Sequence, residues 1–250
     1  MQPDRLRQLF KPKSVALFGA SNVEGALGTV ILQNLKSAGF QGEITLVNPK
    51  YEEIDGDTCF PSLEASGREV DLAVIVAPAK VVPHIIEDCG ESGVGAAIVV
   101  SANFSEAGPK GAALEKEMLR RARRYGIRIL GPNCLGVIRS DIGLNATFSA
   151  GNALPGRIAV ISQSGALCTA ILDWAQDHDV GFSSLISTGI GADVDFGEIL
   201  DFVAMDPGTD SIMLYIEGLK DSRRFMSALR AAARTKPVVI MKSGRHEQGS

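Results

Sequence analysis

The chain has 250 residues, of which 45% are hydrophobic, and it carries a net charge of −4 with a pI near 5.5. Because binding to nucleic acid phosphates needs concentrated Lys and Arg, nucleic acid is not an expected partner. The start has no apolar signal-peptide core, and no stretch approaches the roughly 20 apolar residues that a bilayer demands, so we expect a cytoplasmic protein with no membrane partner.

The first half of the chain alternates short apolar runs with amphipathic stretches. The expected strands are residues 14–18, 44–47, 72–76, 96–100 and 127–130. Unbroken apolar strands separated by helices indicate a parallel sheet that is covered on both faces, as in doubly wound folds. We therefore predict a Rossmann-like domain over residues 1–145.

After residue 138 the pattern breaks into a segment rich in Asn, Gly and Ser, which predicts a boundary within residues 140–156. The alternation then restarts. The expected strands are residues 158–162, 182–187, 211–216 and 237–242, and the expected helices are residues 166–177, 196–205 and 222–234. These elements predict a second, smaller α/β domain over residues 146–250.

A glycine-rich turn follows the first expected strand. Gly19, Ala20 and Ser21 come first, then Gly25 and Gly28, and then an apolar helix. Such a turn exposes backbone N–H groups to a phosphate, and the helix dipole favours the anion. The spacing is not G-x-G-x-x-G, so the alternative is a turn that needs glycine only for its geometry.

The second expected strand ends in Asn48, Pro49 and Lys50. NAD-binding Rossmann domains place an acidic residue near this point for the ribose diol. A lysine fits the 3′-phosphate of coenzyme A or the 2′-phosphate of NADP instead, whereas the alternative is a solvated loop lysine.

The next strands also end in small or turn-forming residues. Ala77, Pro78 and Ala79 end the third strand, and the loop after the fifth contains Asn133 and Cys134. The carboxyl ends of parallel strands meet at the edge where open α/β sheets bind ligands, so an extended cofactor can lie there against the backbone. For the Asn133 loop the alternative is a tight turn between domains.

Two features of the second half point to anion chemistry. The segment Ser162-Gln163-Ser164-Gly165 joins a strand to a helix, where free N–H groups make an anion site, although Ser at such a junction is often only a cap. Glu217 ends an apolar strand. It is either functional or a partly solvated carboxylate.

Seven motifs occur in an order that resembles the NDP-forming acyl-CoA synthetases: GAS, VNPK, DLAVIVAPA, GPNCLGV, LNATF, ISQSGA and YIEGLKD. The chain resembles the ADP-forming acetyl-CoA synthetases and, more distantly, the α subunit of succinyl-CoA synthetase. It is particularly similar to bacterial fusion proteins in which such a region precedes a GNAT-type protein lysine acetyltransferase domain.

The resemblance implies a CoA-binding domain followed by a flavodoxin-like, succinyl-CoA ligase-type domain. The residues it places around CoA or acetyl-CoA are Gly19, Ala20, Ser21, Gly25, Asn48, Pro49, Lys50, Ala77, Pro78, Ala79, Asn133 and Cys134. In the second domain it implies phosphate binding by Ser162, Gln163, Ser164 and Gly165, and it implies that Glu217 orients a phosphohistidine. No metal site is expected within the chain.

The family's histidine lies in a context resembling S-H-T-G-A, which His84, His178 and His246 do not share. We therefore expect the histidine, and an ATP-grasp portion that binds ATP or ADP with Mg in cis or as a separate β subunit, beyond residue 250. This chain alone should bind acyl-CoA and phosphate without turnover. The alternatives are a non-catalytic CoA sensor and an NADP-dependent oxidoreductase, and a homo-oligomer is left open.

Overall fold

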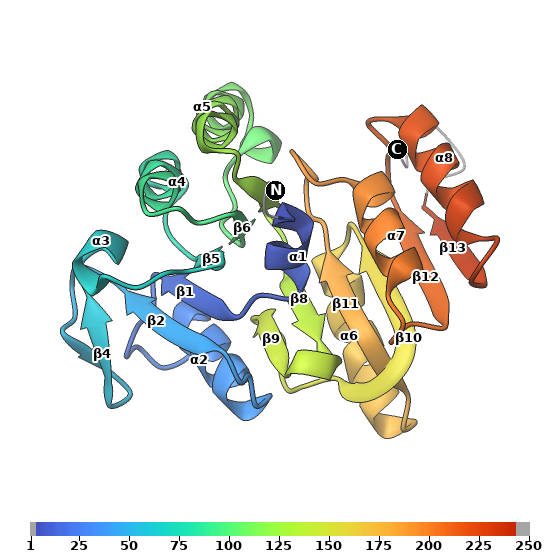
Figure 1. Ribbon diagram of the computed structural model, residues 1–250, viewed down its shortest axis with the longest axis horizontal. Coiled ribbons are helices and arrows are strands. Elements are labelled where there is room, and N and C mark those ends of the chain that lie inside the picture. Colours follow the sequence, from blue (N-terminus) through green and yellow to red (C-terminus); the bar gives the residue numbers. More distant parts are fainter. Residues whose placement is uncertain (1–3, 244–250) are drawn as a thin grey trace.

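The computed structural model describes residues 4–243, in which two sheets are each packed against helices (Figure 1). The first sheet has seven strands in the order β3-β4-β2-β1-β5-β6-β7. Their bounds are β1 (Ser14–Phe18), β2 (Glu43–Val47), β3 (Glu53–Ile54), β4 (Asp57–Phe60), β5 (Leu72–Ile75), β6 (Ala96–Val99) and β7 (Arg128–Leu130). All neighbouring strands are parallel except the short β3–β4 hairpin.

Helices cover both faces of this sheet. They are α1 (Arg5–Phe10), α2 (Leu27–Ser37), α3 (Leu63–Ser66), α4 (Val82–Glu91) and α5 (Pro109–Tyr125), with a 3₁₀ turn η1 (Ser105–Ala107). Along β1, Val15 and Leu17 pack with α1 and α2, whereas Ala16 and Phe18 pack with α4 and α5. Because alternate residues of a strand face opposite sides, this burial explains why the strand is apolar throughout.

The second sheet has six strands in the order β13-β12-β10-β11-β8-β9. The bounds are β8 (Gly136–Arg139), β9 (Leu144–Thr147), β10 (Leu154–Ser162), β11 (Gly181–Ser187), β12 (Ser211–Ile216) and β13 (Val238–Lys242). Its helices are α6 (Gly165–Asp177), α7 (Phe196–Met205) and α8 (Ser222–Ala232), with a 3₁₀ turn η2 (Ser140–Ile142). Strands β10 to β13 pair in parallel, and β8 and β9 pair antiparallel.

Most of the β8–β9 hairpin lies within the range predicted for the first domain, but the hairpin belongs to the second sheet. β8 pairs with β11, so strand pairing moves to the second sheet at Gly136, before residue 146. The backbones approach so closely there that a Cβ on Gly136 would lie 2.0 Å from the Ala146 carbonyl oxygen. The division at residues 145 and 146 stays a prediction about domains, but it is not where the sheets change.

The two units share a buried interface, and residues near the start of the chain are part of it. The Phe10 ring lies 4.8 Å from the Phe202 ring of α7, between centroids. The buried Asn34 side chain of α2 donates hydrogen bonds to the carbonyls of Thr147 and Ser149. These contacts fix the position of the two units relative to each other.

The fold class predicted from the sequence is confirmed: a Rossmann-like unit precedes a smaller flavodoxin-like α/β unit. The four cysteines are free and buried. Among residues 4–243, no helix combines the length and the apolar character that crossing a membrane requires.

Candidate functional site

The glycine-rich turn after β1 allows two very close backbone contacts. Gly19 has φ +88°, and a Cβ there would lie 2.0 Å from the Val76 carbonyl oxygen at the end of β5. A Cβ on Gly28 would lie 2.1 Å from the Gly19 carbonyl oxygen. α2 therefore begins directly against the turn, and its N-cap Ala26 has no side chain that could accept from the first N–H groups.

Short polar contacts order the rest of this loop. Ser21 Oγ accepts a hydrogen bond from the Val23 N–H at 3.0 Å, and Thr29 Oγ1 donates to the Ser21 carbonyl at 2.7 Å. Gly25 has φ +72° and is exposed, and a Cβ added there would meet no atom within 4 Å. The loop is thus fixed at Ser21 and open at Gly25.

Asn48 joins the predicted phosphate loops of β1 and β2. Its Nδ2 donates to the Ala20 carbonyl at 2.7 Å, and its Oδ1 accepts from the Lys50 N–H at 3.1 Å. Pro49 and Lys50 are exposed, and the Lys50 ammonium forms no ion pair within residues 4–243. The structure therefore brings the glycine turn and the lysine to one edge.

The ends of β5, β6 and β7 complete this edge. Ser101 Oγ accepts from the Ala77 N–H at 3.1 Å, and the Ser101 carbonyl accepts from the Asn133 N–H at 3.0 Å. Pro78 and Asn133 are exposed. These loops and the two described above belong to adjacent strands, so their exposed residues lie along one side of the sheet.

Three residues predicted to bind the cofactor have side chains in the core. Ala20, Ala79 and Cys134 are 0%, 7% and 3% exposed. The Cys134 thiol donates to the Val99 carbonyl at 3.4 Å, and burial raises its pKa to about 12. These side chains face away from solvent, so any contact of these three residues with a ligand would come from their backbone.

The second site lies at the start of α6. Ser162 is fully buried, and its Oγ accepts from the Ser164 N–H at 3.0 Å while donating to the Ser164 carbonyl. Ser164 Oγ accepts from the Leu167 N–H at 3.2 Å. Both hydroxyls are therefore engaged in shaping the turn and capping the helix, which agrees with the cap alternative for Ser164.

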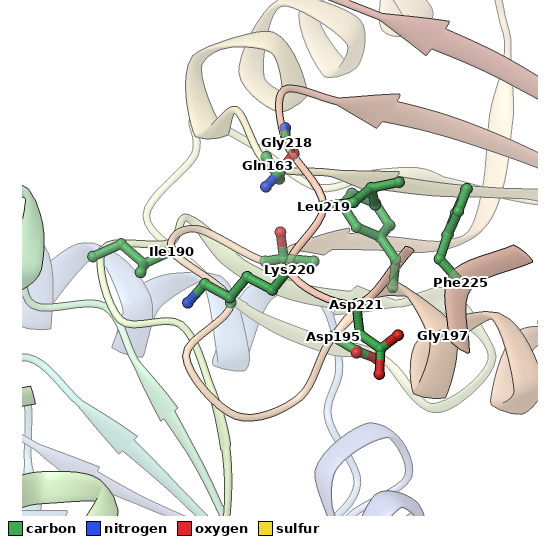
Figure 2. Close-up of a pocket in the computed structure, with 12 residues that line it drawn as sticks. Gln163, Ile190, Asp195, Gly197, Gly218, Leu219, Lys220, Asp221 and Phe225 are labelled. Atoms are coloured by element: carbon green, nitrogen blue, oxygen red, sulfur yellow. Dashed lines mark hydrogen bonds between the residues drawn. The ribbon is translucent and has the colours of Figure 1, made fainter. Parts of the chain in front are cut away.

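A pocket opens beside this turn, at the carboxyl edge of β10, β11 and β12 (Figure 2). Gln163 lines it together with residues of two segments, 188–197 and 218–225, which end in the first turns of α7 and α8. The rings of Phe196 and Phe225 meet edge to face at 6.2 Å on one side. Glu217 is exposed and directly precedes the lining residue Gly218.

The loop of residues 188–195 was not among the predicted site residues. It packs along the end of the first unit, because the Ile190 and Ala192 N–H groups donate to the carbonyls of Pro132 and Gly131 at 3.0 and 2.9 Å. The loop that contains Asn133 therefore also forms a turn between the two units. The two glycines of the S-T-G-I-G-A run after β11, both with positive φ, were the available sequence signal.

The described histidines lie away from Glu217. His84 Nδ1 is 3.0 Å from Arg121 Nη1, between α4 and α5 of the first unit. His178 stacks on Trp174 at the C-terminal end of α6, about 20 Å from Ser164 at the helical rise per residue. His246 lies outside the described residues.

These features define a class: an α/β protein with a glycine-rich loop at the carboxyl edge of one sheet and a pocket at the carboxyl edge of the next. Family models agree with both halves. Residues 13–140 match the CoA binding domain, and residues 155–250 match the succinyl-CoA ligase like flavodoxin domain. The chain belongs to the family of ADP-forming acetyl-CoA synthetase α subunits and α-type regions.

Named relatives share nearly all of the chain. It is 47% identical to an ADP-forming acetate–CoA ligase I of Archaeoglobus fulgidus and 43% identical to an α subunit of such a ligase from Pyrococcus furiosus, over 98% of the chain in both cases. It covers 36% and 54% of those two proteins.

A solved relative has the same backbone arrangement. The acetyl-coenzyme A synthetase 1 of Candidatus Korarchaeum cryptofilum, in complex with phosphate and ADP, is 40% identical with a TM-score of 0.93, over 98% of this chain and 53% of that one. The chain therefore spans between about a third and about half of these relatives.

Proposed function

We propose that the chain is the CoA-binding and ligase-like part of a protein that converts acyl-CoA, ADP and phosphate into acid, ATP and CoA. The observation that carries the proposal is the common edge formed by the Gly19 turn, Asn48 and Lys50 at the ends of β1 and β2. The names of the relatives support this reaction, and acetate is the acyl group in several of them.

CoA would lie along the carboxyl edge of the first sheet. The backbone near Gly19 and Gly25 offers N–H groups for its pyrophosphate, and Lys50 offers an ammonium for its ribose 3′-phosphate. The exposed residues Pro78 and Asn133 continue the edge toward the second unit, where the pocket beside Gln163 opens. This path leads from the nucleotide end of CoA to its reactive end.

The start of α6 and Glu217 would serve the phosphoryl group. The N–H groups at the helix N-terminus favour an anion, and the exposed Glu217 carboxylate suits a hydrogen bond to an imidazole. We propose that this histidine and an ATP-grasp portion, which would bind ADP with Mg, belong to other segments or a partner subunit in the cytoplasm. An acetyltransferase fusion is supported by the motif resemblance alone.

Turnover by the full-length protein tests the proposed function. We expect CoA release from acetyl-CoA that requires both ADP and phosphate, and loss of that release in Glu217→Gln with CoA binding retained. Acetyl-CoA binding without such release, together with no histidine in a segment resembling S-H-T-G-A, would instead support the sensor function and contradict the ligase.

Lys50→Ala should weaken CoA binding by roughly 1–3 kcal/mol and leave dephospho-CoA nearly unchanged, because one charge-assisted contact to the 3′-phosphate is lost. Calorimetric titration with both ligands measures this. Lys13→Ala is the matched control, since Lys13 is an exposed lysine before β1 at the opposite edge of the sheet. Equal weakening of both ligands would remove Lys50 from the phosphate.

A further inference from the structure

The main chain of Glu217 is held by side chains, because Glu217 follows the last residue of β12. Gln163 Oε1 accepts from the N–H groups of Glu217 and Gly218, at 2.5 and 3.0 Å. On the other side, Lys242 Nζ donates to the Glu217 carbonyl at 2.8 Å. Both polar groups of this peptide residue are therefore fixed, although its carboxylate is exposed.

The chemistry of the contacts determines the orientation of the Gln163 amide. Both of its partners are backbone N–H donors, and only the oxygen of a side-chain amide can accept from them. The Nε2 group must then be directed away from the loop. Within residues 4–243 it has no hydrogen-bond acceptor, and Gln163 lines the pocket next to Gly218 (Figure 2).

The backbone of Gln163 is itself well anchored. Its N–H donates to the Tyr215 carbonyl at 3.2 Å and so continues the pairing of β10 with β12. The neighbouring Ser162 and Ser164 form reciprocal hydrogen bonds that rigidify the turn. An anchored residue can restrain a loop, because its own movement is small.

We propose that Gln163 is a positioning residue, whose side-chain oxygen sets the conformation of the Glu217 loop while its NH₂ group faces the pocket. This inference rests on the proposed function for the role of Glu217, and it changes the role of Gln163 from phosphate binding alone. Gln163 thereby links the pocket to the Glu217 loop, because its amide oxygen accepts from the backbone of that loop while the Gln163 side chain lines the pocket.

Three variants of the full-length protein distinguish the acceptor role of the Gln163 amide oxygen from the donor role of its NH₂ group. Gln163→Met has a similar size but accepts no hydrogen bond from an N–H group, whereas Gln163→Glu keeps the acceptor and loses the donor. Lys242→Met removes the hydrogen bond that Lys242 Nζ donates to the Glu217 carbonyl. Gln176→Met is the control, because Gln176 lies on α6, the helix that follows the Gln163 turn, and donates to the Asn152 carbonyl instead.

Hydrogen exchange of the Glu217 and Gly218 amides is the first readout. We expect exchange to be roughly fivefold faster or more in Gln163→Met, as fits the loss of a net hydrogen bond, and close to wild type in Gln163→Glu and Gln176→Met. This readout does not require ligase activity, so its result stands even where the proposed function fails.

The change in kcat compared with the change in KM is the second readout. In Gln163→Met we expect kcat of CoA release to fall about tenfold or more with the KM for acetyl-CoA changed less than twofold, because the nucleotide part of CoA would bind at the other sheet. Unchanged amide exchange in Gln163→Met, or equal acceleration in Gln163→Met and Gln163→Glu, would overturn the proposal. If Gln163→Met does not fold, Lys242→Met and Gln163→Glu still give the comparison. Wild-type amide exchange in Lys242→Met together with faster exchange in Gln163→Glu would contradict the proposal.

Discussion

Gly19→Ala should lower the free energy of unfolding by about 3–5 kcal/mol and abolish CoA binding. Two effects add up at this position. Gly19 has φ +88°, a conformation that disfavours a side chain by about 1–2 kcal/mol, and the new methyl group would lie 2.0 Å from the Val76 carbonyl oxygen, so the β1 and β5 ends must separate. Urea unfolding and CoA titration of the variant measure the two outcomes.

Gly25→Ala is the matched control, because it shares the positive φ without the contact. Gly25 has φ +72° and no atom within 4 Å of the added Cβ. We expect it to lose only about 1–2 kcal/mol, from backbone strain alone. Similar losses of unfolding free energy in both variants would show that close packing of the turn against β5 is not the reason why position 19 needs glycine.

Arg139→Met should lower the free energy of unfolding by about 3–5 kcal/mol, because it leaves a buried carboxylate with one partner fewer. Arg139 is fully buried on β8, and its Nη2 lies 3.1 Å from Asp206 Oδ2 and 2.9 Å from Asp141 Oδ2. Asp206 is itself buried, and its remaining charged partner is Lys11 at 2.9 Å. Urea unfolding measures the loss.

The control for this variant is Arg157→Met, which removes an exposed ion pair with Asp210. Exposed pairs contribute about 0–1 kcal/mol, so a loss below about 1 kcal/mol is expected. If both variants lost the same stability, the cluster of Lys11, Arg139, Asp141 and Asp206 would not be what holds the first residues of the chain to the second sheet.

The same cluster predicts a dependence of stability on acid. Burial, the largest influence, acts to raise the pKa of Asp206 and of Asp141, but the hydrogen bonds and charges of Lys11 and Arg139 together lower the pKa of both carboxyls below their usual values. Groups with a lowered pKa in the folded state stabilise it above the unfolded pKa of about 3.9, and this contribution is lost as pH falls through the folded pKa. Arg139→Met should therefore show a shallower fall of unfolding free energy with acid, measured by urea unfolding from pH 6 downward.

Strands that are buried on both faces could be predicted well from sequence. The strand over residues 14–18 and the helix over residues 196–205 have the predicted bounds. The β8–β9 hairpin was missed because it lies in a segment whose Asn and Gly content indicates loops, and its pairing with β11 depends on contacts distant in sequence. The short β3–β4 hairpin gave no apolar run at all.

The location of the candidate site followed from a rule about strand ends, but the direction of each side chain did not. Strand order places Gly19, Asn48 and Asn133 along one edge, which the alternating pattern already indicated. The sequence could not show that Cys134 points into the core, because a shift of one residue along the loop would turn this side chain the other way. Nor could it show that the Gln163 oxygen binds the Glu217 loop, since Gln163 and Glu217 are 54 residues apart.

Calorimetric titration of the chain with CoA, dephospho-CoA and NADP, at one fixed salt concentration, tests the central claim most directly. CoA is expected to bind, dephospho-CoA to bind more weakly because it lacks the phosphate that Lys50 would contact, and NADP to give no heat of binding. Binding of NADP without binding of CoA would contradict the account of the first sheet as a CoA site.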